Sequence, residues 1–161
     1  MNRTVYIIRH AKSLGNRRNR ATFGVKGAGL SVEGVNTAKK LKKALADLGI
    51  DANKEPVAVS ELIRTRQTAE QAGFKRITTT PLLNEVDSGL QPDTLDRMLL
   101  NKAVPKAAIA AAKKLLKHPP AEQVWVTHGL LIAGLAHELN IPVHKLFVPE
   151  MASITTLTIP S

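Results

Sequence analysis

The sequence contains no cysteine, and aromatic residues make up only 3% of its 161 residues. The missing cysteine excludes disulfide bonds, thiolate catalysis and any cysteine-ligated zinc or iron–sulfur site. The lone tryptophan, Trp125, provides no stacking platform for single-stranded nucleic acid, because such platforms need several aromatic side chains. Long apolar runs are also missing, since none approaches the roughly 18 residues that a membrane-spanning helix needs.

Acidic residues are scarce at the N-terminal end of the sequence. Residues 1–43 contain eleven lysines and arginines but only one acidic residue, Glu33, so this segment accounts for the formal net charge of +10. Concentrated positive charge suggests an anionic partner, either nucleic acid or a phosphorylated substrate. The simplest interpretation of Lys39–Lys43 is a solvated helix face, whereas Arg17–Arg20 falls outside any helical pattern.

Length and overall composition indicate one ordinary globular domain that covers residues 1–161. Domains usually run roughly 100–200 residues, so this length suits a single core. Hydrophobic residues at 43% and charged residues at 22% argue against disorder. The opening Met1–Arg3 leads directly into a strand-like run without the pattern of a secretory signal, which predicts a cytoplasmic protein.

Strand-like and helix-like segments alternate along the sequence. Short β-branched or apolar runs predict strands, and apolar residues repeated every three to four positions predict helices. The predicted strands are Thr4–Ile8, Val57–Val59, Arg76–Thr80, Val124–Val126 and Ser153–Ile159. The predicted helices are Val32–Leu48, Glu61–Ala72, Leu95–Leu100, Lys106–Lys117 and Gly129–Leu139. This order predicts an α/β fold, a three-layer α/β/α sandwich with a mostly parallel central sheet.

Residues suited to phosphoryl chemistry follow these predicted strands. Arg9-His10 ends the first strand, Arg64 follows the second, Glu85 lies in the loop after the third, and His128 ends the fourth. Parallel sheets bind ligands beyond the carboxyl ends of their strands, so we expect one shared site. The glycine-rich loop 11–30 is long enough to be functional as well.

Two imidazoles, two guanidiniums and one carboxyl group form a coherent set for phosphoryl transfer. Arginine holds phosphate oxygens in a bidentate fashion and stays charged. A neutral histidine is a competent nucleophile, and a second histidine can donate to the equatorial oxygens as charge develops there. A carboxyl group with a raised pKa can protonate the leaving oxygen and then activate water.

Five motifs in this order resemble those of the histidine phosphatase superfamily, in its phosphoglycerate-mutase-like branch. The first, Arg9–Asn16, resembles Arg-His-Gly-x-Ser-x-x-Asn, and the third resembles Ser-x-Leu-x-Arg-Thr-x-Gln-Thr-Ala. The full set of matching segments is Arg9–Asn16, Leu30–Ala38, Ser60–Ala69, Leu83–Gly89 and Val126–Gly129. The resemblance implies a phosphoglycerate-mutase-like fold.

The resemblance also implies catalytic roles for five residues. His10 would be the phosphorylated nucleophile and Glu85 the proton donor. Arg9, Arg64 and His128 would hold the phosphoryl group.

Further implications concern substrate, metal and cofactor. The substrate-binding residues implied by the resemblance are Asn16, Thr22, Phe23 and Gly129. The family uses no metal, and we expect no cofactor. Ala11 stands where the family usually has glycine, which is closer to small phosphohistidine phosphatases of the SixA type, whereas Asn16 is similar to the mutase branch.

The spacing of these residues favours hydrolysis over transfer of the phosphoryl group to a second acceptor. Glu85 lies 21 positions after Arg64, and His128 lies 43 positions after Glu85, which leaves little chain for a lid that keeps water from a phosphohistidine. We therefore predict a phosphatase that acts on a phosphorylated small molecule or a phosphoprotein, with a small phosphoglycerate-mutase-like phosphotransferase as the alternative. No nucleic-acid-binding motif is present, so nucleic acid is not an expected partner. The apolar runs are too short to span a membrane, so a membrane is not an expected partner either. Lys12, Arg17, Arg18 and Arg20 are candidates for a rim that attracts anionic substrates.

Overall fold

The structure is a computed structural model that describes residues 2–14, 29–141 and 151–160. Five strands form one sheet in the order β3-β2-β4-β1-β5. They are β1 (Asn2–Arg9), β2 (Pro56–Val59), β3 (Arg76–Thr79), β4 (Val124–Thr127) and β5 (Ile154–Pro160). Every pairing is parallel except that of β5 with β1, which confirms the predicted mostly parallel sheet.

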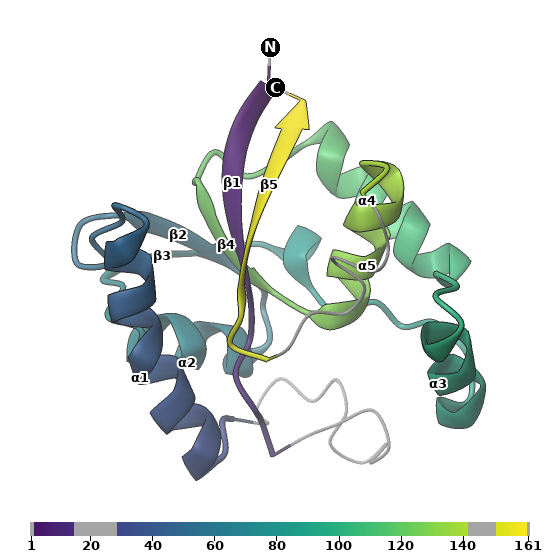
Figure 1. Cartoon of the computed structure of the whole chain (residues 1–161), viewed down its shortest axis with the longest axis horizontal. Coiled ribbons are helices and arrows are strands. Elements are labelled where there is room, and N and C mark those ends of the chain that lie inside the picture. The colour runs from purple at the N-terminus through teal and green to yellow at the C-terminus, as the bar shows by residue number, and fades with distance from the viewer. Residues whose placement is uncertain (1, 15–28, 142–150, 161) are drawn as a thin grey trace.

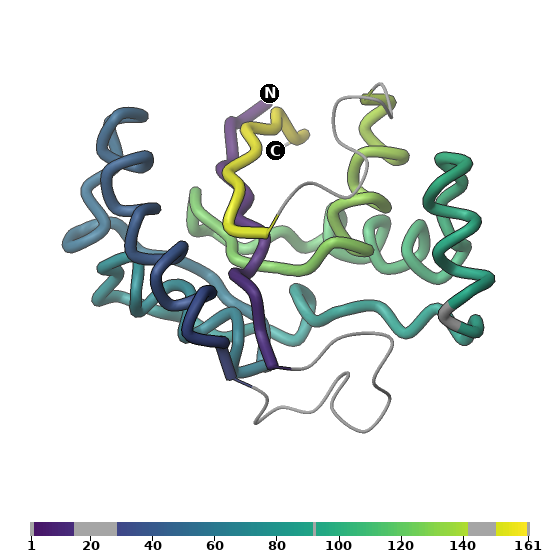
Figure 2. The backbone as a smooth tube through the Cα atoms, turned by 60° about the horizontal axis from the view of Figure 1, so that its bottom comes forward, coloured from purple at the N-terminus to yellow at the C-terminus, as the bar shows by residue number. Residues whose placement is uncertain are grey.

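Helices cover both faces of this sheet (Figure 1). They are α1 (Val32–Asp47), α2 (Ile63–Gln71), α3 (Pro92–Leu100), α4 (Lys106–Lys117) and α5 (Gly129–Glu138), with a short 3-10 helix η1 (Pro81–Leu83). One apolar cluster joins α1 and α2 to one face, and a second joins α4 and α5 to the other. The backbone trace shows the same three layers, with α3 at the outer side of the α4 and α5 layer (Figure 2). The predicted sandwich is confirmed.

The central strand β4 shows why the two layers need apolar side chains on both faces. Trp125 is fully buried in the cluster with α4 and α5, whereas Val124 and Val126 are fully buried in the cluster with α1 and α2. Successive side chains of a strand point to opposite faces, so a central strand covered on both sides is continuously apolar.

Several predicted element boundaries are wrong by a few residues, for local reasons. The helix predicted from Glu61 begins at Ile63, because the Leu62 N–H is held by the Ser60 hydroxyl at 3.2 Å. The helix predicted from Leu95 begins at Pro92, where a proline suits the first turn.

Two further corrections concern helix and strand ends. The helix predicted to end at Leu48 ends one residue earlier, and Leu48 is 44% exposed rather than packed on the sheet. The strand predicted to end at Thr80 stops at Thr79, since Thr80 caps η1 through its side chain. Within the described ranges, no helix is long and apolar enough to cross a membrane.

Candidate functional site

Two histidines meet at the carboxyl edge of the sheet. Arg9 is in register with Thr127 across the β1–β4 pairing, and the His10 N–H donates to the Thr127 carbonyl at 3.0 Å. This places His10 beside His128, which follows β4 and caps α5. Their ring centroids are 5.0 Å apart, with an edge-to-face angle of 60°. The structure thus places side by side two residues that the sequence predicts to share one site.

His10 is held as a neutral ring with one free nitrogen. Its Nδ1 lies 2.7 Å from the Ala11 carbonyl oxygen, which can only accept, so Nδ1 carries the proton and Nε2 the lone pair. Burial, together with the positive charges of Arg64 and Arg9, lowers the pKa of His10 from 6.5 to about 4, against the opposing effect of the hydrogen bond to Ala11. His10 is therefore neutral at neutral pH, the state in which a histidine can act as a nucleophile.

His128 is fully buried. Its Nε2 lies 2.9 Å from the Ser60 hydroxyl, while its Nδ1 makes no hydrogen bond to any residue that the structure describes. Burial first, and then the charges of His10, Arg64 and Arg9, hold the pKa of His128 well below its usual range. The ligand-free site thus contains two neutral imidazoles.

Arg64, in the first turn of α2, brings positive charge near the rings of His10 and His128. Its side chain is buried, and burial lowers its pKa while the Glu85 charge opposes that shift; arginine nonetheless remains charged in proteins. Thr68 links this helix to the segment that follows His10, because its hydroxyl donates to the Arg64 carbonyl at 2.7 Å and accepts from the Ala11 N–H at 3.0 Å.

Glu85 occupies the loop after η1, close enough to Arg9 and Arg64 for their charges to act on it. Burial raises the pKa of the Glu85 carboxyl above its usual range, against hydrogen bonds from the Val86 and Leu130 N–H groups and against both arginines. The loop is fixed to β4 by the Thr127 hydroxyl, which donates to the Leu83 carbonyl at 2.7 Å. A carboxyl group that resists ionisation can serve as a proton donor.

Other predicted site residues have different outcomes. Gly129 is the buried first residue of α5, directly after His128. Asn16, Thr22 and Phe23 lie outside the described residues, as do Arg17, Arg18 and Arg20. Lys12 is described, and its ammonium pairs with the Glu33 carboxylate at 3.3 Å on the exposed surface.

The sequence interpretation gave no role to two buried hydroxyl residues of the site. Thr65 is fully buried, and its hydroxyl oxygen lies 2.8 Å from that of Ser60. Thr68 accepts a hydrogen bond from the Ala11 N–H. Both belong to the Ser60–Ala69 motif, where hydroxyl residues recur on a segment that is otherwise helical. That recurrence was the available signal.

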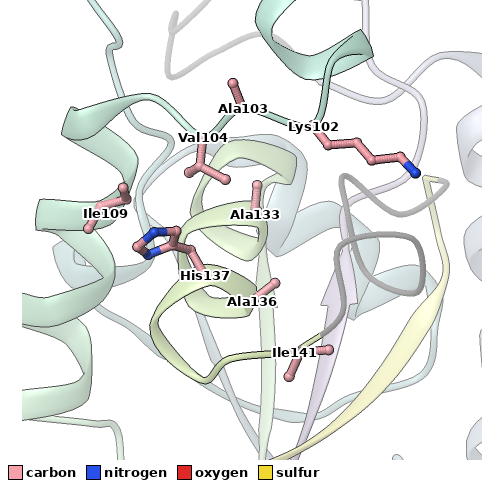
Figure 3. Close-up of a pocket in the computed structure, with 8 residues that line it drawn as sticks. All are labelled: Lys102, Ala103, Val104, Ile109, Ala133, Ala136, His137 and Ile141. Atoms are coloured by element: carbon pink, nitrogen blue, oxygen red, sulfur yellow. The ribbon is translucent and has the colours of Figure 1, made fainter.

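The described residues also contain no cluster of three or more histidine or acidic side chains able to hold a metal ion. A cavity of about 270 Å³ lies elsewhere, between α5 and the segment that joins α3 to α4 (Figure 3). It is lined by Ala133, Ala136 and His137 from α5, toward the end of that helix opposite His128. The cavity is therefore separate from the two-histidine site.

Comparison with known proteins identifies the family. The family model described as "Histidine phosphatase superfamily (branch 1)" matches residues 5–102, which include His10, Arg64 and Glu85. The chain belongs to the histidine phosphatase superfamily. The superfamily covers phosphatase and mutase activities. No curated protein matches the chain.

Solved structures similar to this superfamily member share its fold over almost the whole length. The Thermus thermophilus protein TTHB049 has a TM-score of 0.70 and 24% identity over 96% of this chain and 93% of its own. A phosphoglycerate mutase from Thermus thermophilus has a TM-score of 0.68 and 23% identity over 96% of this chain and 92% of its own. The Mycobacterium tuberculosis open reading frame Rv3214 has a TM-score of 0.65 and 21% identity over 97% and 91%. The predicted phosphoglycerate-mutase-like fold is confirmed.

Proposed function

We propose that this chain is a metal-independent phosphatase that hydrolyses a phosphomonoester or a phosphohistidine through a phosphohistidine intermediate on His10. The observation that supports it best is the state of His10. The ring is neutral, its proton is used on the Ala11 carbonyl, and its Nε2 keeps a lone pair in the buried neighbourhood of Arg64 and His128. A cationic pocket around a neutral nucleophile suits an anionic phosphoryl group.

The first half of the reaction transfers the phosphoryl group to the enzyme. The Nε2 lone pair of His10 attacks phosphorus in line with the leaving oxygen, so a nitrogen–phosphorus bond forms as the phosphorus–oxygen or phosphorus–nitrogen bond of the substrate breaks. Burial raises the pKa of Glu85, which favours its protonated form, and in that form it donates its proton to the leaving atom. The products are the released leaving group, phosphorylated His10 and the Glu85 carboxylate.

The second half returns the enzyme to its starting state. The Glu85 carboxylate accepts a proton from water as the water oxygen attacks phosphorus. The nitrogen–phosphorus bond breaks, inorganic phosphate leaves, and His10 and Glu85 regain their initial protonation.

The remaining groups stabilise the charge on the phosphoryl oxygens. Arg9 and Arg64 supply permanent positive charge beside His10, as their effect on its pKa shows. The N–H groups at the start of α5 supply further donors, because a helix N-terminus favours anions. His128 supplies another once its Nδ1 carries a proton.

The alternative is a small mutase of the same superfamily. The structure titled phosphoglycerate mutase is matched over 92% of its own chain, so short length alone does not separate the two reactions. Hydrolysis remains the preferred proposal because the described segment between Glu85 and His128 supplies core residues of α3 and α4, among them Leu95 and Leu115. These elements are committed to the core rather than available as a lid over the phosphohistidine.

A substrate panel tests the proposal. The purified chain is assayed on phosphomonoesters and on phosphohistidine protein, with release of inorganic phosphate measured in the presence and absence of an alcohol or phosphoglycerate acceptor. A phosphatase releases phosphate without an acceptor, and His10→Ala loses that activity. Turnover that requires an acceptor would instead support the mutase, and no turnover of any substrate would overturn both.

A further inference from the structure

The hydrogen bonds around Ser60 favour one direction over the other. The Thr65 hydroxyl lies 2.8 Å from the Leu62 carbonyl oxygen and 3.2 Å from the Ser60 carbonyl oxygen. Carbonyl oxygens only accept, and a hydroxyl has a single hydrogen, so Thr65 uses its hydrogen on these carbonyls.

This fixes the next hydrogen bond in the chain. The Ser60 and Thr65 hydroxyl oxygens are 2.8 Å apart, and because the Thr65 hydrogen is already used, Ser60 donates to Thr65. The Ser60 oxygen then has only acceptor capacity left. It accepts from the Leu62 N–H at 3.2 Å and from a proton on His128 Nε2 at 2.9 Å.

The opposite direction is disfavoured by burial. If Ser60 donated to Nε2, the ring proton would sit on Nδ1, and a fully buried N–H would have no partner among the described residues. Unpaired buried N–H groups are rare and costly. The network therefore places the His128 proton on Nε2 and leaves an unpaired lone pair on Nδ1.

That bare nitrogen has a consequence for the ligand. Three charged or titratable groups act on His128: His10 and Arg9 from the end of β1, and Arg64 from α2, whose own charge interacts with that of Glu85 from the loop after η1. A phosphoryl oxygen that approaches Nδ1 of His128 meets a lone pair there, not a donor. A hydrogen bond forms there only if a proton arrives with the ligand.

We propose that Ser60 and Thr65 are positioning residues that hold His128 as the Nε2–H tautomer, so that Nδ1 takes up one proton when the phosphoryl group binds. For a monoanionic phosphate ester, the P–OH proton moves to Nδ1 and leaves a dianion. For a dianion, the proton comes from solvent. Either way the complex contains an imidazolium and a dianion, whose charge-assisted hydrogen bond is stronger than a neutral one.

The assignment rests on the proposed function only in that the ligand is a phosphoryl group. The tautomer is a property of the ligand-free protein, and phosphate binding needs no turnover. A chain that proved not to be a phosphatase could therefore still show the tautomer and the proton uptake.

Nitrogen-15 NMR of histidine-labelled protein, without ligand and at neutral pH, tests the tautomer directly. We expect His128 to be neutral with its proton on Nε2. In Thr65→Val the Ser60 hydrogen is released and can donate to Nε2, so the ring proton moves toward Nδ1, whereas Thr65→Ser keeps the hydroxyl and the original tautomer. An Nδ1–H ring or an imidazolium in the unsubstituted protein would overturn the proposal.

Proton uptake is measured by titration calorimetry with inorganic phosphate, in buffers of different ionisation enthalpy, at a pH well above the second pKa of phosphate. The Glu85→Gln background removes the one carboxyl group whose own ionisation would confuse the count. We expect close to one proton taken up per phosphate, and less in Thr65→Val or Ser60→Ala.

If the active enzyme is a phosphatase, Ser60→Ala also lowers kcat/KM roughly 10- to 100-fold, the range found when the partner that orients a metal-bound histidine is removed. Zero uptake, or uptake unchanged in the variants, contradicts the assignment.

Discussion

His10 and His128 lie edge to face with their ring centroids 5.0 Å apart, and each is almost entirely buried. Two imidazolium rings cannot coexist at this distance beside Arg64 without strong repulsion, and burial penalises each charge further. Both pKa values are accordingly lowered. The ligand-free site therefore combines permanent guanidinium charge with a neutral His10, as the proposed nucleophile requires.

Acid should destabilise the protein through His10. Between pH 6.5 and about 4 the unfolded chain binds the His10 proton and the native state does not, so the stabilising contribution is full above pH 6.5 and is lost as pH falls toward 4. The shift corresponds to about 3 kcal/mol. Urea unfolding of the unsubstituted protein and of His10→Ala, each at pH 7 and pH 4.5, measures it. The variant should lose less stability on acidification, and an equal loss in both would refute the lowered pKa.

Glu85→Gln should lower kcat by roughly 10²- to 10⁴-fold for an alkyl phosphate, because the leaving alkoxide then receives no proton. The loss should be much smaller for an aryl phosphate whose leaving group is a weak base. Glu70→Gln, an exposed change on α2, serves as the control and should behave like the unsubstituted protein. Equal losses on both substrates would argue against Glu85 as the proton donor.

The pH profile gives a separate test of the same carboxyl group. Activity should fall on the acid side near pH 4 as His10 becomes protonated, and on the alkaline side as Glu85 passes its raised pKa and loses its proton. In Glu85→Gln the alkaline fall should disappear while the acid fall remains. A profile whose alkaline limb is unchanged in the variant would assign that limb to another group.

Gly34→Ala should impair both stability and turnover. A Cβ at Gly34 would lie 2.0 Å from the Lys12 carbonyl oxygen, so α1 would have to move away from the segment that follows His10. Alanine usually favours a helix over glycine by about 1 kcal/mol, but overpacking should outweigh this and give a net loss of about 1–3 kcal/mol. Thermal unfolding and kcat/KM report the two effects. Asn36→Ala, exposed on the same helix, should be neutral or slightly stabilising.

Positive charge at the N-terminal end should act on the rate of encounter if the predicted rim exists. We expect Arg17→Ala and Arg18→Ala to lower kcat/KM for a multiply charged phosphate at low salt, with little effect at high salt. Lys39→Ala and Lys40→Ala remove charge from the exposed face of α1 and serve as matched controls. Identical salt responses in all four variants would leave the arginines without a steering role.

The architecture and most of the candidate site could be predicted because their signals are local. Strand runs such as Val124–Val126 are apolar on both faces, and the polar residues after the strands must meet at one edge of a parallel sheet. Helix Lys106–Lys117 was predicted with its observed bounds, since Pro105 fixes its start. The superfamily motifs then named His10, Arg64 and Glu85.

Features set by tertiary contact could not be predicted. Leu48 continues the apolar pattern of α1, yet the helix ends before it and leaves it 44% exposed. The start of α2 depends on where the Ser60 hydroxyl lies, because it holds the Leu62 N–H. The proposed tautomer of His128 depends on the Thr65 hydroxyl, which lies five residues after Ser60 in the sequence. Spacing alone carries no information on hydrogen-bond direction.

The most direct test of the central claim is to trap the phosphoenzyme. The chain is mixed with a radiolabelled phosphomonoester that it turns over, denatured rapidly in alkali, and digested so that the labelled peptide can be mapped by mass spectrometry. Attack by His10 predicts a phosphate group on His10, stable in base and lost in acid, absent from His10→Ala and present in His118→Ala, which alters an exposed histidine at the end of α4. His10→Ala should also lose roughly 10⁴-fold or more of the turnover. Label on another residue, or full turnover by His10→Ala, would contradict the account.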